Sequence, residues 1–397
     1  MALPAIPNEI LADIFLRLPT PRGSHPRLRR LRLLPPPRRR PRLPPALPQA
    51  PPSALLGFVD YRGFHPAEPP HPSAPAASAV ASAADFDFKF PPDGDTDLDW
   101  TVREVRDGRV LLDRPRRHDE LEPLFKEMVV CDPLHRQYLL LPPIPSDLAA
   151  PVVSQLLIER SCLAQCFLAP PSDDQMATAT EETSFRVIWL VVLQTRPVAL
   201  VFSSGTGQWQ APSRSESLPG FLLSTWKVWF VSRHYAHGCF DWVSGSCEKL
   251  LVLDIQRMEF SMADHPPCVR FRGDDVAIAE AGQGMTVMFV PKPDTDRRIY
   301  TVWRRSNGGS SAKWQMENET FSLDSGSLIK GAVGRHLLLY YVGSVSVKPG
   351  CYIRDVDTLQ LERSHATLTT QEWMTLCRHQ NHEKLTLEAW KDLLVKN

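Results

Sequence analysis

The stretch Gly238–Pro267, GCFDWVSGSCEKLLVLDIQRMEFSMADHPP, shows how the larger part of this chain is built. Two short apolar runs, Gly238 to Val243 and Leu250 to Asp254, flank a polar Ser-Gly-Ser turn, and a second polar turn leads to Phe260. Short runs rich in Val, Leu, Phe and Trp, bounded by Gly, Ser and Asp, are typical of β-strands joined by turns. The stretch therefore predicts strands and turns rather than helices.

The same chemistry recurs from about Asp85 to Ser364, and hardly any convincing helix interrupts it. The domain is therefore predicted to be mainly β. The expected strands are Val110–Asp113, Met128–Cys131, Tyr138–Leu141, Phe185–Leu193, Ala199–Phe202, Gly238–Val243, Leu250–Asp254, Thr286–Val290, Ile299–Trp303, His336–Tyr341 and Tyr352–Arg354.

A weak internal repeat narrows the architecture. Several units end with a strand, a polar turn and an apolar anchor residue, and in three of them an Asp stands six positions before the anchor: Asp132 and Tyr138, Asp254 and Phe260, Asp355 and Leu361. From Trp209 onward the anchors, which include Trp314, recur about every 50 residues, the length of a kelch-like blade.

This period predicts a kelch-like β-propeller of about six blades, with the anchors packed between blades. The longer gap between Tyr138 and Trp209 is attributed to an inserted loop over Ala169–Ser184.

Gly238–Pro267 also resembles the repeat units of the F-box-associated propeller of plant F-box proteins of the cereal type, in which a Leu-Asp strand is followed by a turn. The resemblance covers the chain from residue 54 to about 364. It implies fold more than function, because propellers serve many purposes.

A second informative segment is Ile6–Pro21, IPNEILADIFLRLPTP. Asn8 is a suitable helix cap, and Pro19 and Pro21 end the helix about three turns later. Ile10, Leu11, Ile14, Phe15 and Leu18 fall on one apolar stripe. A helix this short is marginal alone, so the stripe must be buried against its own domain or a partner.

The segment resembles the opening of an F-box, the helical module that docks substrate receptors on the Skp-type adaptor of cullin-RING ubiquitin ligases. The resemblance implies an adaptor-binding role for Ile6, Pro7, Ile10, Leu11, Ile14, Phe15, Leu18 and Pro19. An amphipathic helix that packs on its own domain is the alternative.

Residues 21–52 contain eleven Pro and nine Arg and carry no acidic residue, so the segment is predicted to be extended and disordered. Three interpretations stay open: a basic arm for nucleic acid, a Pro-rich ligand for SH3-like or WW-like domains, and a sequence that results from a shift of the reading frame and interrupts the F-box after its first helix. We expect residues 1–20 to be the F-box-like helix and residues 53–84 a connector with a short helix over Ala76–Ala84. The propeller is expected over 85–364, and one or two helices over 365–397.

Composition excludes several classes. Lys plus Arg and Asp plus Glu are equal at 45 each, which removes a global electrostatic argument for nucleic acid or membrane binding. We find no signal peptide and no apolar run of membrane-spanning length. The eight Cys lack a regular framework and are expected to be reduced thiols of a protein in the cytoplasm, the nucleus or both.

The sequence carries no P-loop, nucleophile-elbow or HExxH motif. Two groups of Cys and His lie close together in the sequence: His234, His237 and Cys239, and Cys377, His379 and His382. Neither group is accompanied by a second set of Cys or His ligands at the spacing of a zinc finger. We therefore predict a protein that is not an enzyme and has no metal and no cofactor. No substrate-binding residue is predicted.

The two resemblances together imply the substrate-recognition subunit of a cullin-RING ubiquitin ligase, with a Skp-type adaptor and an unknown protein substrate as partners. The alternative is a non-catalytic propeller scaffold that has lost adaptor binding because its F-box is incomplete.

Overall fold

The described part of the chain is a set of antiparallel sheets. The computed structural model describes residues 56–60, 63–69, 73–88, 100–106, 108–114, 125–158, 161–169, 184–212, 218, 230–244, 249–266, 276–292, 299–306, 313–323, 327–341, 350–358 and 361–365. These residues form five four-stranded sheets and one two-stranded sheet. We call each four-stranded sheet a blade.

Each blade is built from consecutive strands, ordered from the inside of the ring outward. Blade 1 contains β3 (Thr101–Arg106), β4 (Arg109–Arg114), β5 (Glu127–Asp132) and β6 (Gln137–Leu140), and blade 2 contains β7 (Ser161–Ala169), β8 (Arg186–Leu193), β9 (Pro197–Ser203) and β10 (Gln208–Gln210). Blade 3 contains β11 (Phe230–Ala236), β12 (Cys239–Ser244), β13 (Lys249–Asp254) and β14 (Glu259–Asp264). Blade 4 contains β15 (Ala277–Ala281), β16 (Met285–Pro291), β17 (Ile299–Ser306) and β18 (Gln315–Ser322), and blade 5 contains β19 (Ser327–Val333), β20 (His336–Tyr341), β21 (Gly350–Asp355) and β22 (Leu361–His365).

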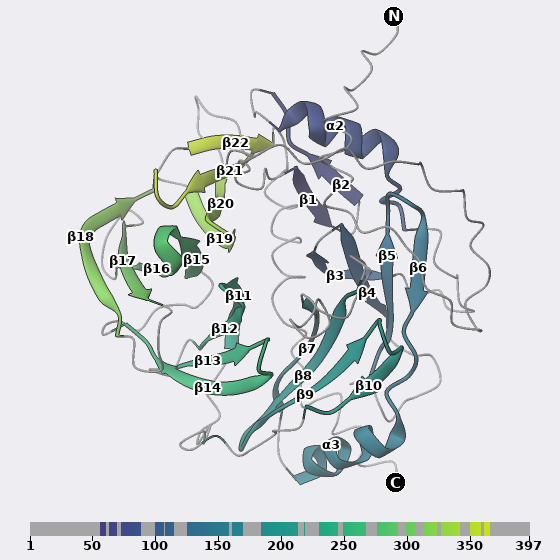
Figure 1. The fold of residues 1–397 in the computed structure, drawn as a ribbon. Coiled ribbons are helices and arrows are strands. Elements are labelled where there is room, and N and C mark those ends of the chain that lie inside the picture. The colour runs from purple at the N-terminus through teal and green to yellow at the C-terminus, as the bar shows by residue number, and fades with distance from the viewer. Residues whose placement is uncertain are drawn as a thin grey trace, which may run out of the picture.

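The blades stand around a ring, which confirms the predicted mainly-β propeller (Figure 1). Five complete blades are close to the expected number of about six. The sector between blades 5 and 1 holds the two-stranded sheet of β1 (Gly57–Asp60) and β2 (Gly63–Pro66), with β1 beside β3 and β2 beside β22.

The blades pack face to face through alternate side chains of their strands, as the pleat of a β-strand requires. β8 shows this best, because each of its residues is buried. Val187, Trp189 and Val191 belong to the core shared with blade 1, whereas Ile188 and Leu190 belong to the core shared with blade 3.

The strands predicted from apolar runs are the two middle strands of every blade and the outer strand of blade 1. The prediction that hardly any helix interrupts the strands is wrong at one place, because α3 (Ser146–Ile158) lies between blades 1 and 2. Its Ala149 and Val152 are buried against the core of those blades. The long gap between Tyr138 and Trp209 therefore contains this helix, and most of the proposed loop, 170–183, lies outside the described residues.

The expected connector contributes ordered elements. β1, β2 and α2 (Ala74–Ala83) lie within 53–84, and α2 confirms the short helix expected over Ala76–Ala84. The Asp85 N–H, just beyond α2, donates to the Pro133 carbonyl in blade 1 at 2.8 Å. The predicted N-terminal helix, the Pro/Arg-rich segment and the C-terminal helices lie outside the described residues. In the part of the chain that the structure describes, no helix is long and apolar enough to span a membrane.

The repeated Asp has a clear role in the turn between the third and fourth strands of a blade. One carboxylate oxygen accepts the backbone N–H groups two and three residues later: Asp132 from Leu134 and His135, Asp254 from Gln256 and Arg257, and Asp355 from Asp357 and Thr358. Such side-chain bonds stabilise the turn locally. The anchor residue then pairs with the residue before the Asp, as Phe260 does with Leu253.

The anchors do not share one environment. Trp209 is buried and its indole N–H donates to the Pro142 carbonyl at 2.8 Å, and Phe260 packs against the core between blades 2 and 3. Tyr138, however, is 46% exposed, so the prediction that anchors pack between blades is wrong for blade 1.

The last turn residue before the fourth strand adopts a left-handed backbone: Arg136 and Met258 have φ of 52° and 53°, and blade 2 places Gly207 there with φ of 68°. A Cβ on Gly207 would meet nothing within 4 Å, so Gly207→Ala adds backbone strain alone. We expect the free energy of unfolding to fall by about 1 kcal/mol, measured by urea titration.

The matched control is Gly205→Ala in the same turn, where φ is not positive and the new Cβ meets only the Ser203 hydroxyl at 3.7 Å. It should leave stability within about 0.5 kcal/mol of the parent. Equal losses in the two variants would show that backbone conformation is not the cause.

Candidate functional site

Charged side chains converge where the inner strands of blades 1, 2 and 3 meet. Arg233 of β11 donates through Nη2 to Glu104 Oε2 of β3 and through Nη1 to Gln165 Oε1 of β7, the latter at 3.5 Å. Glu104 Oε1 lies 3.5 Å from Nη2 of Arg106, the last residue of β3. We call Glu104, Arg106, Gln165 and Arg233 the inner-strand cluster.

Aromatic rings support both guanidinium groups. Arg106 lies 4.3 Å from the ring centroid of Tyr235, and Arg233 lies 4.4 Å from that of Phe167. Phe240 is near both, at 5.5 Å from Arg106 and 5.6 Å from Arg233. Such cation–π contacts hold planar cations in a fixed orientation in a partly desolvated site.

The cluster is mostly shielded from solvent but not closed. The side chains of Arg106 and Arg233 are 17% exposed and that of Glu104 is 14% exposed. Burial lowers the pKa of Arg233, an effect that Glu104 opposes and Arg106 reinforces. Two guanidinium groups face one carboxylate, so the three residues together carry one excess positive charge.

A second buried group lies between blades 3 and 4. The Asp241 carboxylate is 1% exposed, and Arg305 Nη2 lies 3.6 Å from its Oδ1. Burial raises the pKa of Asp241, and the Arg305 guanidinium limits that rise. Neither carboxylate oxygen has a hydrogen-bond partner among the described residues. The Asp241 carboxylate is thus enclosed by the blades, while the Arg305 side chain is 13% exposed.

His234 neighbours this pair as a neutral structural residue. Its Nδ1 accepts the Ile278 N–H at 3.4 Å, which leaves Nε2 to donate to Ser232 Oγ at 2.8 Å. Burial, with a smaller effect of Arg233, lowers the pKa of His234 to about 4. The imidazole is therefore uncharged at neutral pH.

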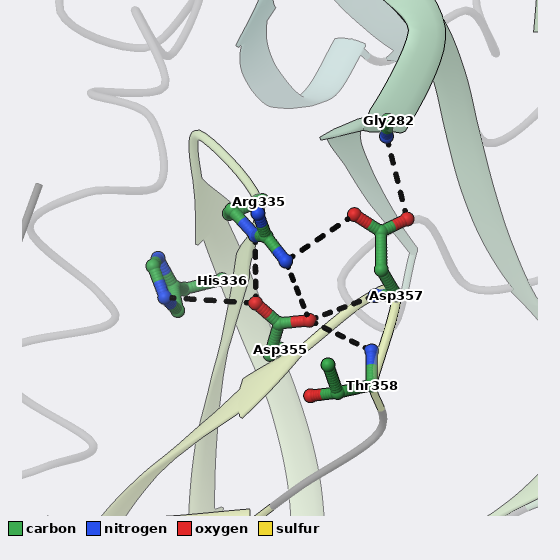
Figure 2. Close-up of polar contacts among 6 residues, drawn as sticks. All are labelled: Gly282, Arg335, His336, Asp355, Asp357 and Thr358. Atoms are coloured by element: carbon green, nitrogen blue, oxygen red, sulfur yellow. Dashed lines mark hydrogen bonds and ion pairs between the residues drawn. The ribbon is translucent and has the colours of Figure 1, made fainter. Parts of the chain in front are cut away.

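The turns of neighbouring blades bond to one another on one face of the ring. Asp355 of blade 5 accepts from Arg335 Nε at 2.7 Å, and Asp357 reaches the Gly282 N–H of blade 4 at 3.3 Å (Figure 2). Arg335 Nη2 joins the two aspartates, at 3.2 Å from Asp355 Oδ1 and 3.4 Å from Asp357 Oδ2. Figure 2 also shows His336 on the other side of Asp355, at 4.0 Å.

An equivalent contact joins blades 3 and 4. The His237 N–H donates to Glu280 Oε1 at 2.8 Å, and His237 Nε2 lies 2.9 Å from the Met285 carbonyl. The Glu280 N–H in turn donates to the Gly334 carbonyl of blade 5 at 2.8 Å. These contacts fix the angle between blades, so we assign the turn network a structural role.

The predicted adaptor-binding residues, Ile6, Pro7, Ile10, Leu11, Ile14, Phe15, Leu18 and Pro19, lie outside the described residues. Cys377, His379 and His382 lie outside them too. His234, His237 and Cys239 have separate surroundings, and burial, with smaller contributions from Asp241 and Asp254, raises the pKa of Cys239 to about 11. The described cysteine side chains Cys131, Cys166 and Cys239 are free thiols.

Sequence reasoning missed the inner-strand cluster. A weak signal exists in Thr101–Arg106, TVREVR, where Glu104 and Arg106 are two residues apart and so share one face of a strand. The sequence carries no signal that brings Arg233, 129 positions later, to the same place.

The comparisons with known proteins bear on the fold. No family model and no curated protein matches the sequence. Among solved structures, the β-propeller domain of the trilobed protease from Pyrococcus furiosus is 10% identical over 68% of this chain and 70% of that chain, with a TM-score of 0.36. An α-L-arabinofuranosidase from Fusarium graminearum is 10% identical over 71% of this chain and 84% of that one, with a TM-score of 0.35.

The acylaminoacyl peptidase from Pyrococcus horikoshii is 11% identical over 67% of this chain, with a TM-score of 0.35, and this chain spans 39% of its length. The prediction that the chain is not an enzyme is corrected: the solved structures similar to it include peptidases and a glycosidase, so the absence of an activity is no longer claimed. At these identities and TM-scores the likeness is no evidence of enzymatic activity, and we assign no reaction to this chain.

The inner-strand cluster makes a prediction about stability. Glu104→Gln leaves Arg233 buried without its carboxylate, so we expect the free energy of unfolding to fall by about 3 kcal/mol. Adding Arg233→Gln should recover part of that loss, because the uncompensated charge is gone. Urea unfolding of the parent, both single variants and the double variant gives the coupling energy. Additive losses would contradict the pairing.

The turn network makes a prediction about pH. Burial alone would raise the pKa of Asp355, but hydrogen bonds from Arg335 and from the Thr358 and Asp357 N–H groups outweigh it and lower the pKa to about 2. The stabilisation is therefore complete above the unfolded-state pKa of about 4 and is lost as the pH falls toward 2. Asp355→Asn should make unfolding by urea less dependent on pH across that window.

At pH 7 we expect Asp355→Asn to cost about 1 kcal/mol, since the amide can still cap the turn but no longer pairs with Arg335. The matched control is Asp264→Asn, because Asp264 is 86% exposed and lies 3.5 Å from Lys249. An exposed pair of this kind should contribute less than about 0.5 kcal/mol. Equal losses in the two variants would argue against the network.

Proposed function

We propose that this chain is the substrate-recognition subunit of a cullin-RING ubiquitin ligase, in which the N-terminal segment docks on a Skp-type adaptor and the propeller binds the protein to be modified. The chain folds as a β-propeller, an architecture that fits a protein-interaction role. The adaptor, the ligase and the substrate belong to the proposal alone.

The observation that carries the proposal is the apolar stripe of Ile10, Leu11, Ile14, Phe15 and Leu18, preceded by Ile6-Pro7 and ended by Leu18-Pro19. A stripe on so short a helix must be buried against its own domain or a partner, and the proposal assigns it to a partner. The described propeller begins with β1 well after this segment, so an N-terminal docking helix and a separate recognition domain are compatible with the fold.

In this role the protein would bring a target close to a ubiquitin-loaded enzyme. Holding two reactants together raises their effective concentration, which accelerates transfer. The turns and inner strands of the propeller supply a surface whose side chains differ from blade to blade, as target recognition requires.

Co-purification of the full chain with a Skp-type adaptor tests the proposal. The parent should bind with roughly micromolar affinity or better, and a variant with Ile10→Ala, Leu11→Ala and Phe15→Ala should lose binding, because it removes the apolar contact surface. A variant with Ala12→Ser and Asp13→Asn, positions on the opposite side of the predicted helix, is the matched control and should bind as the parent does.

A parent that fails to bind the adaptor would overturn the ligase proposal. The remaining function would be that of an interaction propeller whose docking module is interrupted, an alternative favoured by the Pro-rich and Arg-rich composition of 21–52, which does not support further F-box helices.

A further inference from the structure

Arg106 is a cation whose hydrogen-bonding capacity is largely unused. A guanidinium has five N–H donors. The contacts of Arg106 with described residues are a single 3.5 Å approach to Glu104 and the rings of Tyr235 and Phe240. Its Nε is buried and has no acceptor in the described part of the chain.

Glu104 does not neutralise Arg106, because its other oxygen is engaged by Arg233. One carboxylate therefore contacts two guanidinium groups. A buried cation without a full set of acceptors is costly, and a ligand anion that supplies those acceptors gains free energy when it binds.

Gln165 adds a second donor to the same cluster. Its Oε1 accepts from Arg233 Nη1 at 3.5 Å and from Trp242 Nε1 at 3.1 Å. Because both partners are donors, the oxygen must point toward them, and the amide NH2 remains available to an acceptor. The Arg106 and Gln165 donors thus belong to one group of side chains from β3 and β7.

We propose that the inner-strand cluster binds a carboxylate presented by an acidic segment of a partner protein, with Arg106 as the primary contact. The excess charge of one matches a monoanion such as an Asp or Glu side chain. A planar carboxylate also fits the two parallel N–H groups of a guanidinium. A phosphate dianion would leave the site with excess negative charge.

The site lies along the inner strands of blades 1 to 3, beside the core between blades 2 and 3 that contains Phe167 and Phe240. β3 and β11 are innermost in their blades, and Arg106 is the last residue of β3, next to the turn that leads to β4 (Figure 1). The residual exposure of Arg106 and Arg233 leaves the cluster in contact with solvent, whereas the Asp241 carboxylate is enclosed.

This inference rests on the proposed interaction role of the propeller, but not on adaptor docking. The two are separable because the adaptor-binding residues precede the described propeller. The variant with Ile10→Ala, Leu11→Ala and Phe15→Ala should keep carboxylate binding, and Arg106→Gln should keep adaptor binding. A failure of either proposal is therefore recognised independently.

Thermal unfolding of the full chain with sodium acetate, sodium phosphate or sodium chloride at equal ionic strength tests the ligand class. Acetate should raise Tm by about 2 °C or more above chloride, and phosphate should raise it less. Arg106→Gln should abolish the acetate shift, and Arg106→Lys should reduce it. Arg257→Gln, in an exposed turn of blade 3, is the control and should keep the full shift.

The source of the carboxylate is tested with a fluorescein-labelled peptide Gly-Ser-Glu-Glu-Ser-Gly and its Gln counterpart. The Glu peptide should bind the parent at least about tenfold more tightly than the Gln peptide, and Arg106→Gln should remove the difference.

If neither acetate nor phosphate raises the Tm of the parent protein above its value in chloride, water alone satisfies Arg106 and the proposal fails. A larger effect of phosphate would overturn the assignment to a carboxylate, and acetate binding without peptide discrimination would overturn the assignment to a protein segment.

Discussion

The structure depends on the burial of both faces of each blade's middle strands. In β8 successive side chains alternate between the core with blade 1 and the core with blade 3, so each residue removes apolar surface from water. A side chain of this size contributes about 1.5 to 3 kcal/mol when it is fully buried. No blade can achieve this alone, because its faces are completed by its neighbours, and stability therefore belongs to the ring rather than to any single sheet.

Face-to-face packing is not directional, so other contacts must set the angle at which blades meet. The turn network does this on one face of the ring: Arg335 joins Asp355 to Asp357, Asp357 reaches Gly282, and Glu280 bonds to the blades on both sides of its own. In the sector between blades 5 and 1, the described strands are β1 and β2. Local hydrogen bonds thus supply the orientation that apolar packing leaves open.

In the same architecture, the side chains of the inner strands can differ from blade to blade and can therefore serve function. An inner strand has a neighbouring strand on one side only, and near the centre of the ring it can carry charge. β3 and β11 use this freedom for Glu104, Arg106 and Arg233, whereas the inner strand of blade 4 carries the small and apolar residues Ala277, Ile278 and Ala279 followed by Glu280, which belongs to the turn network. The inner strands therefore differ in charge from blade to blade, and recognition would be asymmetric within a nearly repetitive fold.

The amino-acid sequence was sufficient to predict the fold class, the middle strands and the turns that follow them. Middle strands such as Leu250–Asp254 are buried on both faces, so they appear as continuous apolar runs, and the Asp of each turn acts on N–H groups only two or three residues away. The other strands, the helix α3 and the inner-strand cluster depend on contacts between distant parts of the chain. Strands such as the inner strand β3 and the outer strand β18 are largely polar and resemble loops, and α3 is obscured by the nearby Pro142, Pro143, Pro145 and Pro151. Tyr138, on the outer strand of blade 1, is 46% exposed. Glu104 and Arg233 meet because closure of the ring brings β3 and β11 together, and an ion pair between residues 129 positions apart leaves no local pattern in the chain.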